Sequence, residues 1–284
     1  MVRDANFRPR RPHLQMVDPN SFALADVPTI TYVIVAGIAF AGGLIGTMSG
    51  AGTGLLIAIF IAPVVGVRAV VPVLSVTSIV VNLSRIWVFR HTLDRRLALI
   101  CIATAAPGAV LGATVYSLLS ERAVAVLLGV FLVGMVGVRR LPLDRLVRRG
   151  ATGASNERRR ARVLAAGSFG AGTFVGAVPG AGLLMISVLL GAGMRGMALL
   201  GTEASAALAM AMAKTVAFSG YTLLTWKLAL VGGLIGLCTI PGTWIARILV
   251  ERMSLRIHTL FLDLIIVAGG LSFLWRSLAG SGLV

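Results

Sequence analysis

Four ionisable residues stand inside otherwise apolar stretches of the sequence: Arg85, Glu203, Lys214 and Asp263. A charge at the centre of a bilayer costs about 2.5–3.5 kcal/mol on insertion scales, so such residues indicate a function. Arg85 and Lys214 fall at similar places in two related segments, and two cations there would suit a divalent or sulfonate anion. Arg85 comes late in the apolar stretch 70–89, and its side chain could instead reach the membrane surface. Lys214 is deeper in its own stretch, which favours a functional role.

The two acidic residues also have alternative interpretations. Glu203 falls near the start of its apolar stretch, where a helix N-terminus would stabilise the carboxylate without any function. It could instead be a coupling carboxylate that takes a proton in one state and releases it in the other. Asp263 could transfer a proton in the same way, or pair with Lys214 or an arginine. Asn82 could donate a hydrogen bond to an oxyanion, although polar residues also join helices inside membranes.

Two glycine-rich segments, 42–56 and 172–184, repeat glycine at every fourth position over part of their length. On a helix this spacing stacks small residues on one face, so that a neighbouring backbone can pack closely. Both segments also contain residues that interrupt a helix at matching places, and broken helices in two halves of a chain indicate a transporter's substrate site. We therefore predict that Asn82, Arg85 and Lys214 bind substrate together with six residues of the two segments: Ser49, Gly50, Gly52, Pro179, Gly180 and Gly182.

The bulk composition requires a lipid surface around these residues. Hydrophobic residues make up 57% of the 284 residues and charged residues 13%, with a mean hydropathy of +0.95, whereas a soluble domain carries about 25% charged residues. The apolar runs are continuous and do not alternate as in a membrane barrel, which favours helices. Roughly eight to ten stretches approach the ~20 residues of a membrane helix. The sequence predicts an all-α, polytopic membrane bundle.

Several chemistries lack the residues that they need. The formal net charge of +16 does not indicate nucleic-acid binding, because the arginines gather in loops between apolar stretches, as the positive-inside rule expects. The three histidines, His13, His91 and His258, have no cysteine or acid at a spacing that suits a metal. No nucleophile motif stands near a base, and no nucleotide-binding loop is present. We predict no enzyme, no cofactor and no metal site, with a small anion and the lipid bilayer as partners.

An internal duplication organises the chain. The glycines of 42–52 match those of 172–182, Gly66-Val67-Arg68 matches Gly193-Met194-Arg195, and Pro107-Gly108 matches Pro241-Gly242, all in the same order. The duplication predicts a polar N-terminal tail, a first membrane repeat, an arginine-rich linker, a second membrane repeat and a C-terminal tail. Their boundaries are 1–28, 29–141, 142–162, 163–277 and 278–284.

The basic residues orient the predicted bundle. The linker 142–162 carries seven arginines and two acids, so we expect it on the cytoplasmic side of a bacterial cell membrane, with the loop 90–96 on the same side. If each glycine-rich opening is one crossing, each half has four spans and both chain ends are cytoplasmic. If each opening is two crossings, each half has five spans and the halves are inverted. Basic-residue counting favours four, and the glycine-rich faces could also serve a homodimer.

These motifs resemble the sulfite exporter TauE/SafE family, also called the four-toluene-sulfonate-uptake permease family. The resemblance covers about residues 30–277 and rests in the first half on the glycine ladder, Asn82, Arg85 and Pro107-Gly108. In the second half it rests on Gly201-Thr202-Glu203, a polar turn at Trp226-Lys227 and Ile240-Pro241-Gly242. Members usually carry aspartate where this chain has Glu203. The resemblance implies transport of small sulfur-containing or organic anions such as sulfite, sulfonates or sulfoacetate.

We therefore expect a secondary transporter of such an anion, coupled to an ion or to protons, with alternating access around a central site. Glu203 and Asp263 are the candidate coupling acids. One alternative is an anion-permeable channel, which would need a continuous polar lining that these stretches lack. The other is a membrane partner protein that transports nothing.

Overall fold

The computed structural model of the chain describes residues 29–49, 53–140, 157–194 and 196–250, with the single positions 271 and 275. The first half contains α1 (Thr29–Ser49), α2 (Thr53–Val65), the short 3-10 helix η2 (Val67–Ala69), α3 (Val70–Phe89), α4 (Arg95–Leu118) and α5 (Glu121–Arg140). The second half contains α7 (Glu157–Ala177), α8 (Gly182–Gly191), α9 (Gly196–Gly220) and α10 (Trp226–Val250). Every regular element within the described ranges is a helix, which confirms the predicted all-α class.

Local signals in the sequence set the ends of these helices. Asp94 precedes α4 and accepts a hydrogen bond from the Leu97 backbone N–H at 3.1 Å, which is an N-cap. Gly66 follows α2 and Gly193 follows α8, with φ angles of 83° and 89°. Glycine adopts such angles without a steric penalty. The glycines of the two matched motifs, Gly66 and Gly193, therefore both adopt a positive φ shortly after a short helix.

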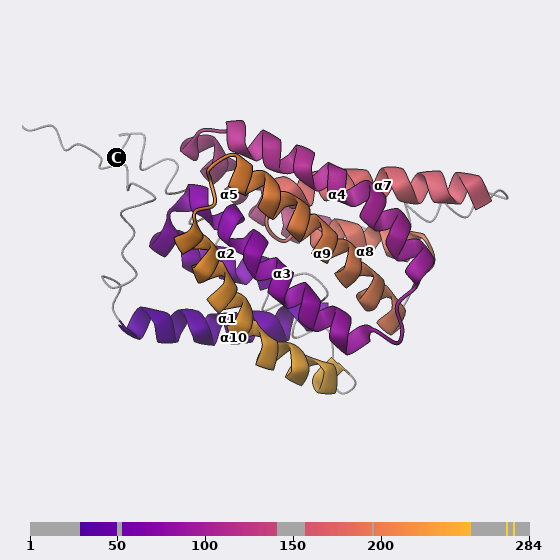
Figure 1. Cartoon of the computed structure of the whole chain (residues 1–284), viewed down its shortest axis with the longest axis horizontal. Helices are drawn as coiled ribbons and strands as arrows, with labels where there is room; N and C mark the ends of the chain where they lie inside the picture. The colour runs from indigo at the N-terminus through magenta and orange to yellow at the C-terminus, as the bar shows by residue number, and fades with distance from the viewer. Residues whose placement is uncertain are drawn as a thin grey trace, which may run out of the picture.

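The helices form two layers (Figure 1). In one layer, α10, α3, α9 and α4 lie side by side in this order. In the other, α1 packs against α10 and α7 packs against α4, with α2 beside α1 and α8 beside α7. The first helix of each half of the chain therefore packs against a long helix of the other half.

Glycine brings the backbones of these paired helices into contact. A Cβ atom at Gly43 of α1 would overlap the Thr239 carbonyl of α10, and one at Gly172 of α7 would overlap the Ala105 carbonyl of α4. The two Pro-Gly motifs face the same interfaces from the other side, since Gly108 packs on the α7 backbone and Gly242 on the α1 backbone. Small residues permit such close packing in membranes. The packing interpretation of the glycine ladder holds at Gly172, whereas in α1 the contact with α10 is made by Gly43, next to the ladder residue Gly42.

Each glycine-rich opening consists of two helices that fold back on one another. Gly46 of α1 packs against Thr53 at the start of α2, and Gly167 of α7 packs against Val188 of α8. Whether an opening makes one or two crossings stays a prediction, because Ile34–Thr47 and Gly182–Gly191 are apolar but shorter than the described helices that could span a membrane. α1 ends at Ser49 and α2 begins at Thr53, with the residues between them outside the described part of the chain. α7 ends at Ala177, shortly before Pro179 and Gly180, which both disfavour a continued helix.

The two central helices, α3 and α9, run in opposite directions. Near the start of α3, Ser75 Oγ accepts a hydrogen bond from Thr215 Oγ1, near the end of α9, at 2.8 Å. Near the end of α3, Phe89 packs against Gly201, near the start of α9. The middle of the molecule is thus an antiparallel helix pair.

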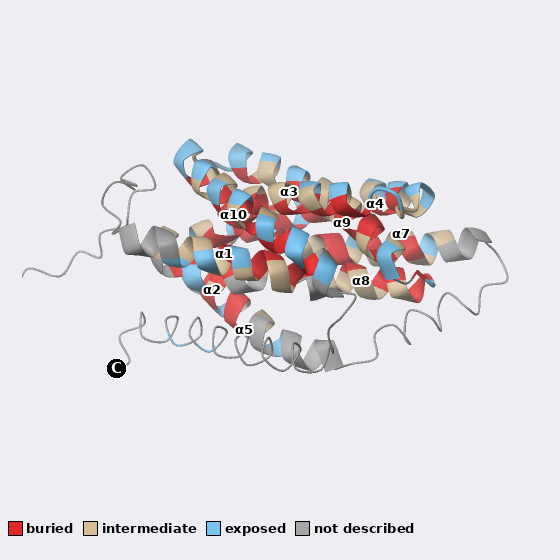
Figure 2. Cartoon of the chain, turned by 90° about the horizontal axis from the view of Figure 1, so that it is seen from below, coloured by how far each residue is buried: buried red, intermediate tan, exposed pale blue. Residues whose placement is uncertain are grey.

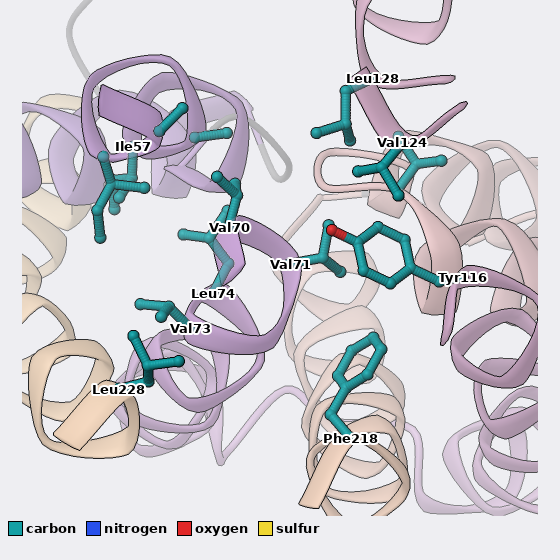
Figure 3. Packing of buried hydrophobic residues seen from close by; sticks show 14 of the residues in the cluster. Ile57, Val70, Val71, Val73, Leu74, Tyr116, Val124, Leu128, Phe218 and Leu228 are labelled. Carbon is teal, nitrogen blue, oxygen red and sulfur yellow. The ribbon is translucent and has the colours of Figure 1, made fainter. Parts of the chain in front are cut away.

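Tyr116, near the end of α4, belongs to a hydrophobic cluster of buried residues (Figure 3). The Tyr116 ring packs edge-on against Phe218, with ring centroids 5.5 Å apart and an interplanar angle of 71°. Its hydroxyl donates to the Arg68 carbonyl at 3.1 Å, which gives the buried phenol the polar partner that it needs. Val71 and Val124 lie beside the same ring (Figure 3). This contact joins the ends of α4 and α9 to the starts of α3 and α5.

Buried residues lie mainly between the layers and exposed residues face outward (Figure 2), and many of the exposed residues are large hydrophobics. Leu99, Leu118, Val216 and Trp226 are each more than 60% exposed, and soluble monomers rarely expose contiguous apolar patches of large area. Four described helices are long and apolar enough to cross a membrane: Val67–Phe89, Arg95–Leu118, Gly196–Gly220 and Trp226–Ala246. Two more are apolar but shorter, Ile34–Thr47 and Gly182–Gly191. The expectation of eight to ten spans exceeds this number and stays a prediction.

Candidate functional site

A cavity of about 90 Å³ lies between α1 and α2, α3, the turn that joins α7 to α8, and α9. Seven residues that were singled out from the sequence line it: Asn82, Arg85, Pro179, Gly180, Gly182, Glu203 and Lys214. They are as much as 132 positions apart in the chain, and they come from both halves. The fold therefore brings most of the predicted polar and glycine positions to one place.

Arg85 and Glu203 form an ion pair in this cavity. Nη2 of Arg85 lies 2.6 Å from Oε2 of Glu203, and the two side chains are only 6% and 2% exposed. Nη1 of Arg85 donates to Asn82 Oδ1 at 3.1 Å, and Asn82 Nδ2 donates to the Ser78 carbonyl at 2.8 Å. Burial of a charge is tolerated when the charge is paired and hydrogen-bonded. The pair and its amide partner therefore account for how these charges persist inside an apolar bundle.

This geometry argues against one alternative for each of the two charged residues. Arg85 is buried, so its side chain does not extend to the membrane surface. Glu203 lies seven residues after Gly196, beyond the first turn of α9, so a helix N-terminus does not account for it. The pairing of Arg85 with Glu203 was not predicted. The available signal was the general one that a buried charge needs a partner of opposite sign.

The guanidinium of Arg85 retains capacity to donate to another molecule, because neither Nε nor Nη2 has a hydrogen-bond partner among the described residues. The neighbouring hydroxyl of Ser84 is also buried without such a partner. An unsatisfied buried donor costs about 1–3 kcal/mol. An acceptor from water or from a ligand would remove this cost at Arg85.

Lys214 is held by a carbonyl that a proline leaves free. Pro179 follows Val175 by four residues and has no N–H, so it cannot close the helical hydrogen bond to the Val175 carbonyl. The Nζ atom of Lys214 donates to that carbonyl at 3.4 Å. The carbonyl belongs to the last turn of α7, the negative end of the helix dipole. Within the described ranges, no carboxylate lies within 4.0 Å of the Lys214 ammonium.

The two helix breaks meet at the same cavity. Between α7 and α8 the backbone turns at Gly180, whose φ is 84°. Gly54, in the first turn of α2, packs on this turn, since a Cβ atom there would lie 3.7 Å from Gly180 N and 3.8 Å from Pro179 Cβ. The first turns of α2 and α8 carry backbone N–H groups without intrahelical partners. Both turns border the cavity through Thr53, Gly54 and Gly182.

The two cations line one cavity but do not sit side by side. Lys214 adjoins Thr215, which is hydrogen-bonded to Ser75, and Arg85 is ten residues further along α3. Ten residues of helix span about 15 Å. Glu203 also offsets the charge of Arg85, so the described lining carries one net positive charge. Joint binding of a divalent anion by the two cations therefore stays a prediction.

The remaining predicted site residues are only partly placed. Ser49 is the last residue of α1, while Gly50, Gly52 and Asp263 lie outside the described residues. Their roles stay predictions. The lining also includes residues that were not predicted to bind substrate, among them Thr53, Gly54 and Val175. Gly54 belongs to the glycine ladder, so its spacing was a usable signal. In the part of the chain that the structure describes, no group of three His, Cys, Asp or Glu side chains could hold a metal ion.

The sequence model of one protein family, described as sulfite exporter TauE/SafE, matches residues 35–273. The chain belongs to the sulfite exporter TauE/SafE family. The match includes both glycine-rich segments and every residue that lines the cavity. TauE/SafE membership makes the chain a membrane transporter, in agreement with its apolar helices, and confirms the resemblance seen in the motifs. No curated protein and no solved structure matches this TauE/SafE chain.

Proposed function

We propose that this TauE/SafE protein is a secondary transporter that moves a small sulfur-containing or organic anion across the cytoplasmic membrane, coupled to an ion or to protons. The anion belongs to the sulfite, sulfonate or sulfoacetate class. The observation that carries the proposal is the cavity of one net positive charge where the two helix breaks meet. Ionisable residues inside a membrane bundle indicate an ion or substrate path.

The donors around the cavity suit an oxyanion. The ammonium of Lys214 has only a neutral carbonyl as its described partner, and Nε of Arg85 has none. The first turns of α2 and α8 add backbone N–H groups at the positive ends of helix dipoles. A volume of about 90 Å³ well exceeds the ~10–15 Å³ that admits one water. It suits a small oxyanion better than a nucleotide or a peptide.

The transport mechanism in this proposal is alternating access between two inverted repeats, 29–141 and 163–277. The antiparallel directions of α3 and α9 support an inverted relation between the two repeats. The packing of α1 against α10 and of α7 against α4 also supports it. The α3–α4 loop and the start of α7 lie at the same end of the molecule (Figure 1). Both carry arginines, which supports a cytoplasmic position for that end. Substrate sites at the interface of inverted repeats are typical of secondary transporters.

The first test is anion flux in proteoliposomes that contain the purified chain, with and without an imposed pH gradient. Sulfite, methanesulfonate and acetate are offered in parallel. We expect saturable flux of a sulfur oxyanion, and we expect Lys214→Ala to lower it at least tenfold, because the cavity then loses its net positive charge. Lys227→Ala is the matched control, since Lys227 is the other lysine of the chain and lies exposed at the start of α10.

The same vesicles separate the carrier from its rivals. A carrier saturates and exchanges labelled for unlabelled anion, whereas a channel shows neither behaviour. Absence of flux for every offered anion, in vesicles that hold folded protein, would exclude the anion assignment and favour a partner protein. An equal loss of flux in Lys227→Ala and Lys214→Ala would show that the cavity charge is not responsible.

A further inference from the structure

The Arg85 guanidinium already has a carboxylate, that of Glu203, as its neighbour. A guanidinium presents N–H groups in two parallel pairs, one made by Nη1 and Nη2 and the other by Nε and Nη2. Oxyanions bind most strongly when they accept from both members of a pair. Nη2 contributes one N–H to each pair, and Oε2 of Glu203 lies 2.6 Å from this nitrogen, so the carboxylate stands where an anion paired with Nη2 would bind. Nη1 is held by Asn82 as well.

We propose that Glu203 and the transported anion compete for Arg85, so that the anion binds when Glu203 takes up a proton and the two cross the membrane together. This inference rests on the proposed function, whose site it completes. When Glu203 is protonated, its carboxyl group loses the charge that holds it to Nη2. The Nε–Nη2 pair then becomes available, and its Nε already lacks a partner in the described structure.

The proton and charge balance of this step is simple. The Glu203 carboxylate gains one proton from water on the side where the anion enters, and it returns that proton to water where the anion leaves. A monoanion thus crosses with one proton and no net charge. The anion replaces the negative charge of Glu203 beside Arg85, so the cavity does not hold two anions around one guanidinium. Two such anions would repel each other strongly in a medium of low dielectric constant.

The other charged groups near Glu203 are few. On α3 the charged residue is Arg85, and α8 carries none. At the start of α4, Asp94 donates its backbone N–H to Thr202 Oγ1 at 3.2 Å, and the two arginines that follow it are exposed. On α7, the nearest charged side chain that is described, Arg162, is exposed. Lys214 lies eleven residues further along α9.

Lys214 is the one group that could imitate the proposed effect. Loss of its proton at high pH would also weaken anion binding, and the sign would be the same as for Glu203. The two origins are separable because arginine keeps its charge at any pH at which the protein is studied. A pH dependence that persists in Lys214→Arg and disappears in Glu203→Gln originates at Glu203.

The test is isothermal titration calorimetry of the purified full chain with methanesulfonate, which remains a monoanion over the whole range from pH 5.5 to pH 8. Titrations in two buffers of different ionisation enthalpy count the protons taken up per anion bound. For the parent we expect about one proton, and a Kd that rises up to ~10-fold per pH unit where Glu203 is deprotonated. Glu203→Gln should bind without proton uptake and with a constant Kd. Glu121→Gln, an exposed acid at the start of α5, should behave like the parent.

The outcomes distinguish this inference from the proposed function. If methanesulfonate binds the parent without proton uptake, or if Glu203→Gln keeps the pH dependence, competition for Arg85 is excluded while the anion site stands. If neither the parent nor Glu203→Gln binds the anion at any pH, the proposed anion site itself is excluded, and the inference falls with it. Where Glu203→Gln does not fold, the proton count of Lys214→Arg decides the question: about one proton taken up per anion supports Glu203, and none excludes it.

Discussion

At the scale of single residues, the cavity depends on polar groups whose partners are incomplete. The Val175 carbonyl is free because Pro179 has no N–H, and Lys214 uses it. The Arg85 guanidinium contacts the Asn82 amide and the Glu203 carboxylate, and its Nε has no hydrogen-bond partner among the described residues. Each group is satisfied well enough to persist in the bundle, yet each has capacity for a ligand.

Asn82 offers a residue-scale test of whether charge or hydrogen bonding controls anion affinity. Asn82→Asp would place a second carboxylate beside Arg85 and cancel the net positive charge of the cavity. We expect it to raise the anion Kd at least tenfold, about 1.4 kcal/mol or more. Asn82→Ala removes one hydrogen bond without adding a charge and should cost less. A smaller effect for Asn82→Asp than for Asn82→Ala, measured by calorimetry, would argue against charge control.

The sequence allowed us to predict which residues belong to the site better than which of them contact one another. Arg85, Glu203 and Lys214 were recognisable because charges are rare and costly in apolar stretches. Their pairing was not, because a separation of 118 positions between Arg85 and Glu203 says nothing about contact. The effect of Pro179 on the Val175 carbonyl was also not predictable. It matters only because Lys214 lies beside that carbonyl, which depends on how α9 packs against α7.

At the scale of helices, glycine fixes where elements touch. The α4–α7 and α1–α10 pairs bring backbone atoms together at matched positions in the two halves. Lipid supplies no hydrophobic drive for helix association, so van der Waals contact of this kind holds the pairs. The glycine spacing predicted the existence of such faces. It did not predict that each face would serve a helix of the other half.

Two neighbouring glycines of α7 test this packing. A Cβ atom at Gly172 would overlap the Ala105 carbonyl, whereas one at Gly170 would meet nothing within 4 Å. We expect Gly172→Ala to destabilise the fold by about 1–3 kcal/mol through overpacking, visible as a lower unfolding temperature in detergent. Gly170→Ala should leave that temperature unchanged or raise it slightly, because alanine favours the helix. Equal unfolding temperatures for both variants would contradict the close α4–α7 contact.

At the scale of the whole molecule, the two halves meet at their helix breaks. Gly54 of the first half packs on Pro179 and Gly180 of the second, directly beside the cavity. If the halves rearrange during transport, this contact should open and close. The all-helical membrane class was predictable from composition, but the meeting of the breaks was not, since it depends on how the helix layers pack.

A disulfide across this contact would test the rearrangement. A Cβ atom at position 54 would lie 3.8 Å from Pro179 Cβ, which matches the mean Cβ–Cβ distance of disulfides. In a chain with Cys101 and Cys238 replaced by alanine, we expect Gly54→Cys with Pro179→Cys to form the bond on oxidation. Flux should then fall to the level of empty vesicles and recover on reduction. Each single cysteine variant is the control, and full flux through the oxidised double variant would show that the breaks stay together.

The scarcity of lysine gives the fold a built-in chemical reporter. Only two side-chain amines exist in the chain: Lys214 is buried in the cavity, whereas Lys227 is exposed. A membrane-impermeant acylating reagent will therefore modify Lys227 readily from the side that it faces. It will modify Lys214 only while the cavity is open to the side on which the reagent was added. The ratio of the two modified peptides, measured with reagent added on each side of the vesicle, reports what fraction of the protein has its cavity open to that side.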